Sequence, residues 1–268
     1  MALYCLVSPG GSPGVTTTAL GLALTWPGRV LVAECDPMGR RVLPGYMADR
    51  MRESAGPGLL GLAMAAEADQ HGPLALDEYV VPIVDDGRVE LLHGVRDPRH
   101  GIRLAPLWQR LAAAFAARDG DVVADLGQVG GTDTPHELLG AADAVVMVLR
   151  PTLPQVDAAT PRLDALKGLL GERAAIRLCL IADGAYRAAE VERALGVAVL
   201  AELPCSPSDA RVLSDGTRPR LTFKTSLLMR SLNGLGGQLR GAVPGSTSGV
   251  FADLTPRSAV PAVIGGGQ

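Results

Sequence analysis

The segment "SPGGSPGVTTTALGLAL" at residues 8–24 contains the residue types that hold phosphate. It follows the apolar run "LYCLV" at 3–7, and its glycine-rich turn leads into threonines that open a helical pattern. In such a turn the backbone N–H groups converge on an anion, and the helix dipole adds partial positive charge. The candidate nucleotide-contacting residues are Gly10, Gly11, Ser12, Gly14, Val15, Thr16 and Thr17.

The standard phosphate-loop signature, G-x-x-x-x-G-K-[ST], matches this segment only in part. When Gly14 is placed on the last glycine, Thr16 and Thr17 take the hydroxyl positions. The same alignment puts Val15 on the lysine and Pro9 on the first glycine. Taken alone, the pattern is equally typical of a strand-to-helix turn without a ligand.

Two aspartates lie at or near the ends of strand-like runs. Asp36 comes after "RVLVAEC" (29–35), and Asp125 lies within "DVVADLG" (121–127). Because the carboxyl ends of parallel strands meet at one edge of a sheet, we expect both carboxylates to lie near Thr16. An aspartate at the end of a buried strand can also cap the next turn or helix, but for Asp125 we favour a role in a site.

Short apolar runs alternate with helical patterns along the chain, which predicts a mainly parallel twisted sheet with helices on both faces. Strands are expected over 2–7, 29–35, 89–94, 121–127, 144–151, 176–183 and 197–204. Helices are expected over 16–26, 59–68, 106–117, 155–170, 188–195 and 222–240. We predict a single domain over 1–240 and a disordered Gly/Pro/Ser-rich tail over 241–268.

Composition limits the function classes. The formal net charge of −3 argues against a protein coated in nucleic acid. The chain has no apolar run of membrane-spanning length and no basic leader before its first strand, so we expect a cytoplasmic protein. The cysteines lack zinc-ligand spacing and indicate buried thiols in a reducing compartment. The histidines also lack metal-ligand spacing, and we assign them no role. Richness in alanine, glycine and arginine with little lysine is typical of a high-GC bacterial genome.

The order of the motifs resembles that of the ParA/MinD family, P-loop NTPases that position plasmids, chromosomes, division sites, flagella or pili. "VLVAECDPMGR" resembles the family's D-x-D-P-Q-G segment, with Asp36 matching and Glu34 in place of the first aspartate. "DVVADLGQVGG" (121–131) resembles the Walker B strand and the start of switch II. "AADAVVMVLRPTLPQVDAA" (141–159) and "LPCSPSDARVLSDG" (203–216) resemble later segments. The resemblance covers about residues 2–240 and implies a P-loop NTPase fold.

The resemblance also implies roles for individual residues. Thr16 and Asp125 would hold Mg²⁺ if nucleotide is bound, and Asp36 would be the catalytic carboxylate that orients the attacking water. Asp183 lies where the family commonly has an asparagine that reads adenine. Since an aspartate cannot donate to the base, a surface turn is the favoured interpretation there.

The family's two loop lysines align with Gly10 and Val15, so both are missing, and Pro13 removes one N–H donor. A hydrogen bond to a charged group contributes about 1.5–3 kcal/mol. Loss of the lysine at Val15 alone therefore predicts triphosphate binding that is about 10- to 150-fold weaker. Hydrolysis depends on positioned positive charge and is expected to be slow or absent. The sequence thus predicts a degenerate site with weak ATP/Mg binding or none.

Three functions follow from this interpretation. The first is a dimeric scaffold or positioning factor that recruits a protein partner of unknown identity. The second is a switch that binds ATP and hydrolyses it slowly through Asp36 and Asp125. The third, a relative of the nitrogenase iron protein, is remote because Cys35, Cys179 and Cys205 do not match cluster-ligand positions.

A basic C-terminal face raises the question of non-specific DNA binding. A solvated face is the favoured interpretation. The leucines of the last helical pattern are expected to pack on the sheet rather than to bind a membrane. The candidate DNA-contacting residues are Arg211, Arg218, Arg220, Lys224 and Arg230.

Overall fold

The structure of the protein, a computed structural model, describes residues 1–11, 13–49, 55–171 and 175–242. These residues form an eight-stranded sheet with the order β3-β4-β2-β5-β1-β6-β7-β8. Every strand pair is parallel except β3–β4 at one edge. The strands are β1 (Leu3–Ser8), β2 (Val30–Glu34), β3 (Val81–Pro82), β4 (Val89–Leu92), β5 (Asp121–Gln128), β6 (Ala144–Leu149), β7 (Ala175–Ala182) and β8 (Val199–Pro204).

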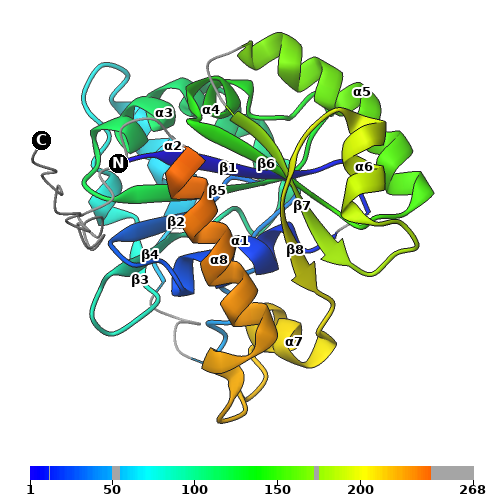
Figure 1. Cartoon of the computed structure of the whole chain (residues 1–268). Helices are drawn as coiled ribbons and strands as arrows, with labels where there is room; N and C mark the ends of the chain where they lie inside the picture. The colour runs from blue at the N-terminus through cyan, green and yellow to red at the C-terminus, as the bar shows by residue number, and fades with distance from the viewer. Residues whose placement is uncertain (12, 50–54, 172–174, 243–268) are drawn as a thin grey trace, which may run out of the picture.

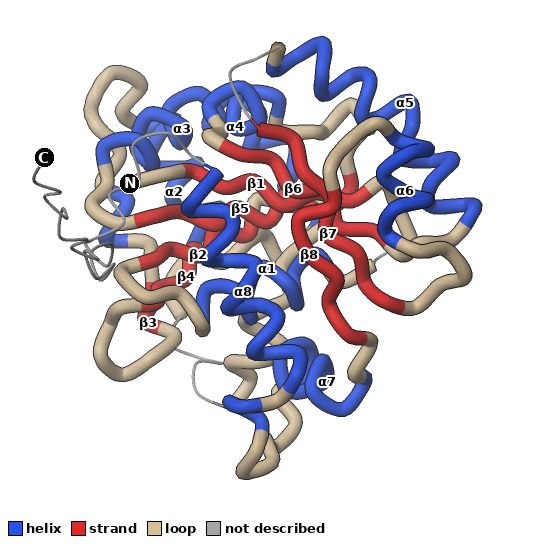
Figure 2. Tube along the Cα trace, in the orientation of Figure 1, coloured by secondary structure: helices blue, strands red, loops and turns tan. Residues whose placement is uncertain are grey.

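Helices cover both faces of the sheet, as Figures 1 and 2 show, so the fold class expected from the sequence is confirmed. The core on one face contains apolar residues of α2 (Gly58–Ala68), α3 (Trp108–Ala117), α4 (His136–Ala141), α5 (Leu153–Leu170) and α6 (Ala188–Leu195). The core on the other face contains those of α1 (Val15–Leu24), α7 (Pro207–Asp215) and α8 (Leu227–Ala242). Because the central strands are covered on both sides, their side chains are almost all apolar.

The last helix packs on the sheet, as its leucine spacing predicts. Leu228, Leu232, Leu235 and Leu239 are buried in the same core as α1. The close approach of α1 and α8 requires a residue without a side chain at Gly21, where a Cβ would lie 2.6 Å from a methyl of Leu232. Within the part of the chain that the structure describes, no helix has the length and apolar character to cross a membrane.

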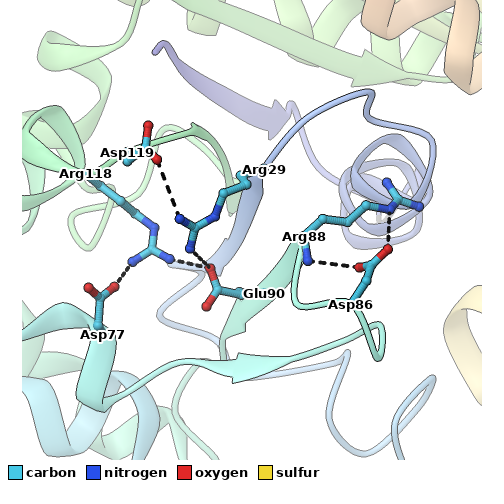
Figure 3. Close-up of polar contacts among 7 residues, drawn as sticks. All are labelled: Arg29, Asp77, Asp86, Arg88, Glu90, Arg118 and Asp119. Carbon is cyan, nitrogen blue, oxygen red and sulfur yellow. Dashed lines mark hydrogen bonds and ion pairs between the residues drawn. The ribbon is translucent and has the colours of Figure 1, made fainter.

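An ion-pair network joins the elements at the amino edge of the sheet (Figure 3). Arg118, which follows α3 and has a buried side chain, bonds to Asp77 in the 3-10 turn η1 (Leu76–Glu78) and to Glu90 in β4. Arg29, just before β2, lies 3.8 Å from Glu90 and 3.5 Å from Asp119. The network therefore fixes the strand ends that lie opposite the glycine-rich loop.

Several details differ from the sequence-based expectation. The two-residue strand β3 and the one-and-a-half-turn helix α4 were not expected, because both are too short to show periodicity. The helices expected from 106 and 222 begin at Trp108 and Leu227, after the 3-10 turns η2 (Pro98–Leu107) and η3 (Phe223–Thr225).

The predicted division into a domain over 1–240 and a tail over 241–268 stays a prediction. Gly241 and Ala242 belong to α8, so the helix passes the expected end of the domain at 240. The rest of the expected tail, 243–268, lies outside the described residues.

Candidate functional site

The glycine-rich loop joins the end of β1 to the start of α1 at the carboxyl edge of the sheet. Gly10, Gly11 and Gly14 have φ values of 137°, 70° and 106°. Residues other than glycine rarely adopt this backbone conformation. The first N–H groups of α1 have no acceptor within the helix, and its first turn carries no acidic residue. The loop and helix therefore favour an anion. Ser12 lies outside the described residues.

Thr16 and Asp125 are in direct contact. The Thr16 hydroxyl donates to Asp125 Oδ2 at 2.5 Å, and the Gly127 N–H donates to Oδ1 at 3.0 Å. Asp125 is only 2% exposed, and burial raises its pKa to about 7 although both hydrogen bonds act to lower it. The contact joins the start of α1 to β5, and it brings together the two side chains that the resemblance assigns to Mg²⁺.

Asp36 lies beside this pair. Its Oδ1 accepts from the Met38 N–H at 2.9 Å, and a Cβ on Gly127 would lie 2.3 Å from its Oδ2. Burial raises the pKa of Asp36, and the Met38 N–H and the charge of Arg41 act against that rise. The glycine at 127 thus lets the ends of β2 and β5 bring both carboxylates to one place, as the strand order predicts.

Val15 carries no charge into this site. Its side chain is 6% exposed and belongs to the apolar core on the α1 face. Thr17, two residues further along α1, lines the cleft described below. The residue at the lysine position of the signature therefore contributes to packing.

A cleft of about 800 Å³ opens over these groups. Arg40 and Arg41, from the segment after β2, line it together with the start of α1. Sequence reasoning missed both arginines, and the only signal was their position directly after the D-P-x-G segment. The other lining residues are Ser8, Gly14, Val15, Thr16, Thr17, Asp36, Met38, Pro44, Gly45, Gly127, Gln128, Leu213, Ser214 and Asp215.

A smaller hollow of about 230 Å³ continues from the cleft, because Gly14 and Thr17 line both. Its walls are mainly apolar and come from the end of β8 and from α8, with Arg150 at its edge. Asp183, the position compared with an adenine-reading asparagine, is half exposed and lies 3.7 Å from Arg150. Asp183 does not line the hollow, so its favoured interpretation as a surface turn agrees with its position.

The residues present fit a magnesium ion only together with a ligand's oxygens. Among the described residues, no three His, Cys, Asp or Glu side chains form a metal-binding group. Mg²⁺ is commonly held by one or two carboxylates plus substrate phosphates. Asp125 supplies one such carboxylate beside the glycine-rich loop, and Thr16 supplies a hydroxyl next to it.

Another hollow, of about 860 Å³, lies at the amino edge of the sheet. Three arginines line it, but each is already engaged: Arg118 and Arg29 are ion-paired, and Arg110 donates to the carbonyls of Ala66 and Gly72. The cleft at the carboxyl edge is therefore the better candidate site.

The expected DNA-contacting residues lie on or around α7, η3 and α8, and all are exposed. Arg220 is paired with Asp209 at 3.0 Å and bonds to Ser208, so part of its charge is already neutralised.

A parallel sheet with a glycine-rich loop after its first strand, and a buried aspartate on the adjacent strand β5, defines the P-loop NTPase fold. No family model and no curated protein matches the chain. Solved structures of MinD and ParA proteins do match it, and their fold is the fold of this chain. Since these structures share less than a fifth of their residues with it, the likeness establishes the fold alone.

Three of these structures are representative. The septum site-determining protein MinD from Pyrococcus horikoshii OT3, complexed with Mg-ADP, is 17% identical at a TM-score of 0.68, over 89% of this chain and 95% of that one. A ParA family ATPase from Chlorobium tepidum TLS is 17% identical with a TM-score of 0.67, over 88% of this chain and 98% of that one. A chain of the MinC:MinD cell division protein complex from Aquifex aeolicus is 12% identical with a TM-score of 0.70, over 97% of this chain and 99% of that one.

Proposed function

We propose that the protein is a ParA/MinD-like positioning factor that acts as a dimeric scaffold and recruits a protein partner. Its cleft binds nucleotide weakly or not at all, and its hydrolysis of ATP does not exceed the background rate. The observation that carries this proposal is the pairing of a retained Thr16–Asp125 contact with a core-packed Val15 at the lysine position. The Mg-ADP in the P. horikoshii MinD and the partner in the A. aeolicus complex support such a role.

Different residues of the chain have different roles at this site. The loop amides and the start of α1 bind the phosphates, and Thr16 and Asp125 would hold Mg²⁺. When bound, the ion supplies positive charge to the phosphate oxygens. Burial raises the pKa of Asp125 to about 7, so binding of the ion near neutral pH would displace a proton from part of the molecules. Without a lysine at Val15, the transition-state charge on the phosphoryl group is poorly stabilised, and turnover falls.

Phosphate release from MgATP tests this proposal. We expect the wild-type protein to release phosphate at the background rate. Val15→Lys should tighten MgATP binding about 10-fold or more, because the lysine stem can occupy the valine pocket while its ammonium reaches the cleft. Calorimetry measures the affinity, and circular dichroism checks that the variant is folded. Rapid wild-type turnover that is lost in Asp36→Ala would contradict the scaffold role.

The alternative is a switch that binds ATP and hydrolyses it slowly. The retained carboxylates Asp36 and Asp125, both beside the cleft, favour it. The same phosphate-release assay separates the two functions, since the switch requires turnover above background. Non-specific DNA binding through the basic residues around α7 and α8 stays a prediction.

A further inference from the structure

The segment after β2 is held in place by its backbone and not by its arginine side chains. Glu34, buried at the end of β2, accepts from the N–H of Arg41 at 2.5 Å and of Val42 at 2.7 Å, and from Gly94 at 3.2 Å. The N–H of Arg40 donates to the carbonyl of Val95 at 2.8 Å. The position of the segment is therefore fixed without any contribution from the two guanidinium groups.

Both arginines line the cleft, where the charge of Arg41 acts on Asp36. Within the described residues, neither Arg40 nor Arg41 forms an ion pair. Burial lowers the pKa of Arg40, the nearby Glu34 carboxyl raises it, and the charge of Arg96 lowers it again. Because Glu34 already accepts three backbone hydrogen bonds, an anion in the cleft would give this partly desolvated guanidinium a counter-charge of its own.

No lysine is available to take this role. The chain contains two lysines, Lys167 and Lys224. Lys167 lies in α5 and donates to the carbonyl of Leu195, and Lys224 lies in η3. Neither lines the cleft, so its cationic side chains are the two arginines. A guanidinium is also well suited to phosphate, because its planar fork donates two parallel hydrogen bonds.

We infer that Arg40 and Arg41 replace the missing loop lysine as the cationic side of a phosphate site. They hold the terminal phosphates of a nucleoside di- or triphosphate across the cleft from the start of α1. The inference rests on the proposed function, because it assigns the counter-charge of that same nucleotide site. Asp36 and Asp215 also line the cleft, so their charges offset those of the two arginines. The anion is therefore bound by the position of the two guanidinium groups and not by the overall charge of the cleft.

The test is calorimetric titration of inorganic tripolyphosphate and of MgATP into the full chain. We expect the double variant Arg40→Ala/Arg41→Ala to bind both ligands about 10-fold or more weakly than wild type. The lysine pair Arg40→Lys/Arg41→Lys should recover part of the loss, because it keeps the charge and loses the fork. Arg96→Ala is the matched control: it removes a charge next to Arg40 but lies outside the lining. It should change affinity less than about twofold, as an exposed charge.

Four outcomes of these titrations overturn the inference. A double variant with a wild-type melting curve and undiminished affinity excludes the arginines from the phosphate site. An equal loss of affinity in Arg96→Ala shows that the overall charge of the region is responsible. A wild-type protein that binds MgATP but not tripolyphosphate owes its affinity to the nucleoside. Absence of wild-type binding to either ligand also overturns it, although the scaffold function stands. Rapid ATP turnover contradicts the proposed function while leaving the arginine result intact, so the two failures are distinguishable.

Discussion

Asp125 is a carboxylate at a position where burial opposes its charge. The Thr16 hydroxyl and the Gly127 N–H favour the charged form, but desolvation is the larger effect and raises the pKa to about 7. The neighbouring acids Asp36 and Glu34 act in the same direction as burial. A metal ion or phosphate-bound metal would reverse this balance, so the residue is better suited to a ligand-bound state than to the free protein.

Stability of the ligand-free protein should therefore decline as pH rises. The native pKa of Asp125 lies above its ordinary value of 3.8, so the native state binds this proton more tightly, and the stabilisation disappears between about pH 4 and 7. Asp125→Asn should flatten this dependence and raise the free energy of unfolding at pH 8 by about 2 kcal/mol, allowing for a lost hydrogen bond. Urea unfolding at pH 5 and pH 8, without Mg²⁺ or nucleotide, measures it. Asp86→Asn, an exposed control, should keep the wild-type slope.

At the scale of elements, the cleft wall depends on close packing between the segment after β2 and the end of α7. Gly45 lies so near Ser214 that a Cβ on it would be 2.0 Å from the Ser214 carbonyl oxygen. A Cβ on Gly216 would likewise lie 2.6 Å from the Gly45 carbonyl oxygen. Arg40 and Arg41 belong to the same segment and line the cleft together with Gly45 and Ser214.

Gly45→Ala should separate the two elements. The new methyl group meets backbone that cannot move alone, so we expect the free energy of unfolding to fall by about 1–3 kcal/mol. The control is Gly28→Ala, where a Cβ has no neighbour within 4 Å, and which should be neutral or slightly stabilising. Denaturant unfolding of both variants gives the comparison. Equal stability of Gly45→Ala and wild type would show that the two segments are not in firm contact.

At the scale of the whole molecule, the sheet separates two apolar cores, and these contain most of the thiols. Cys5 and Cys35 lie in one core, Cys179 lies in the other, and all three are buried. Cys205 is exposed at the edge of the small hollow beside the cleft, so the expectation of buried thiols is wrong for this residue. It lies in the short connection between β8 and α7.

Thiol titration of the native protein should follow this division. Burial raises the pKa of Cys5, Cys35 and Cys179, and the thiolate is the reactive form. We expect one thiol to react rapidly with a disulfide reagent in the native state and four to react in denaturant. Cys205→Ser should remove the rapid phase. Rapid reaction of more than one thiol would mean that a core opens on the assay's timescale.

The sequence by itself determined the longer strands and helices and the convergence of Thr16, Asp36 and Asp125, but not the short elements β3 and α4. Apolar periodicity is a local property, and the ends of parallel strands must meet at one edge, so these features can be inferred without the structure. The roles of these residues with nucleotide remain predictions.

The tertiary structure decided which other side chains face the cleft. Glu34 fixes the backbone of the segment that carries Arg40 and Arg41 to the cleft, and Asp209 neutralises part of the charge of Arg220. Such contacts join residues whose separation along the chain carries no periodic signal. The path of a loop, and so the direction of its side chains, depends on hydrogen bonds and packing that exist only once the elements are assembled.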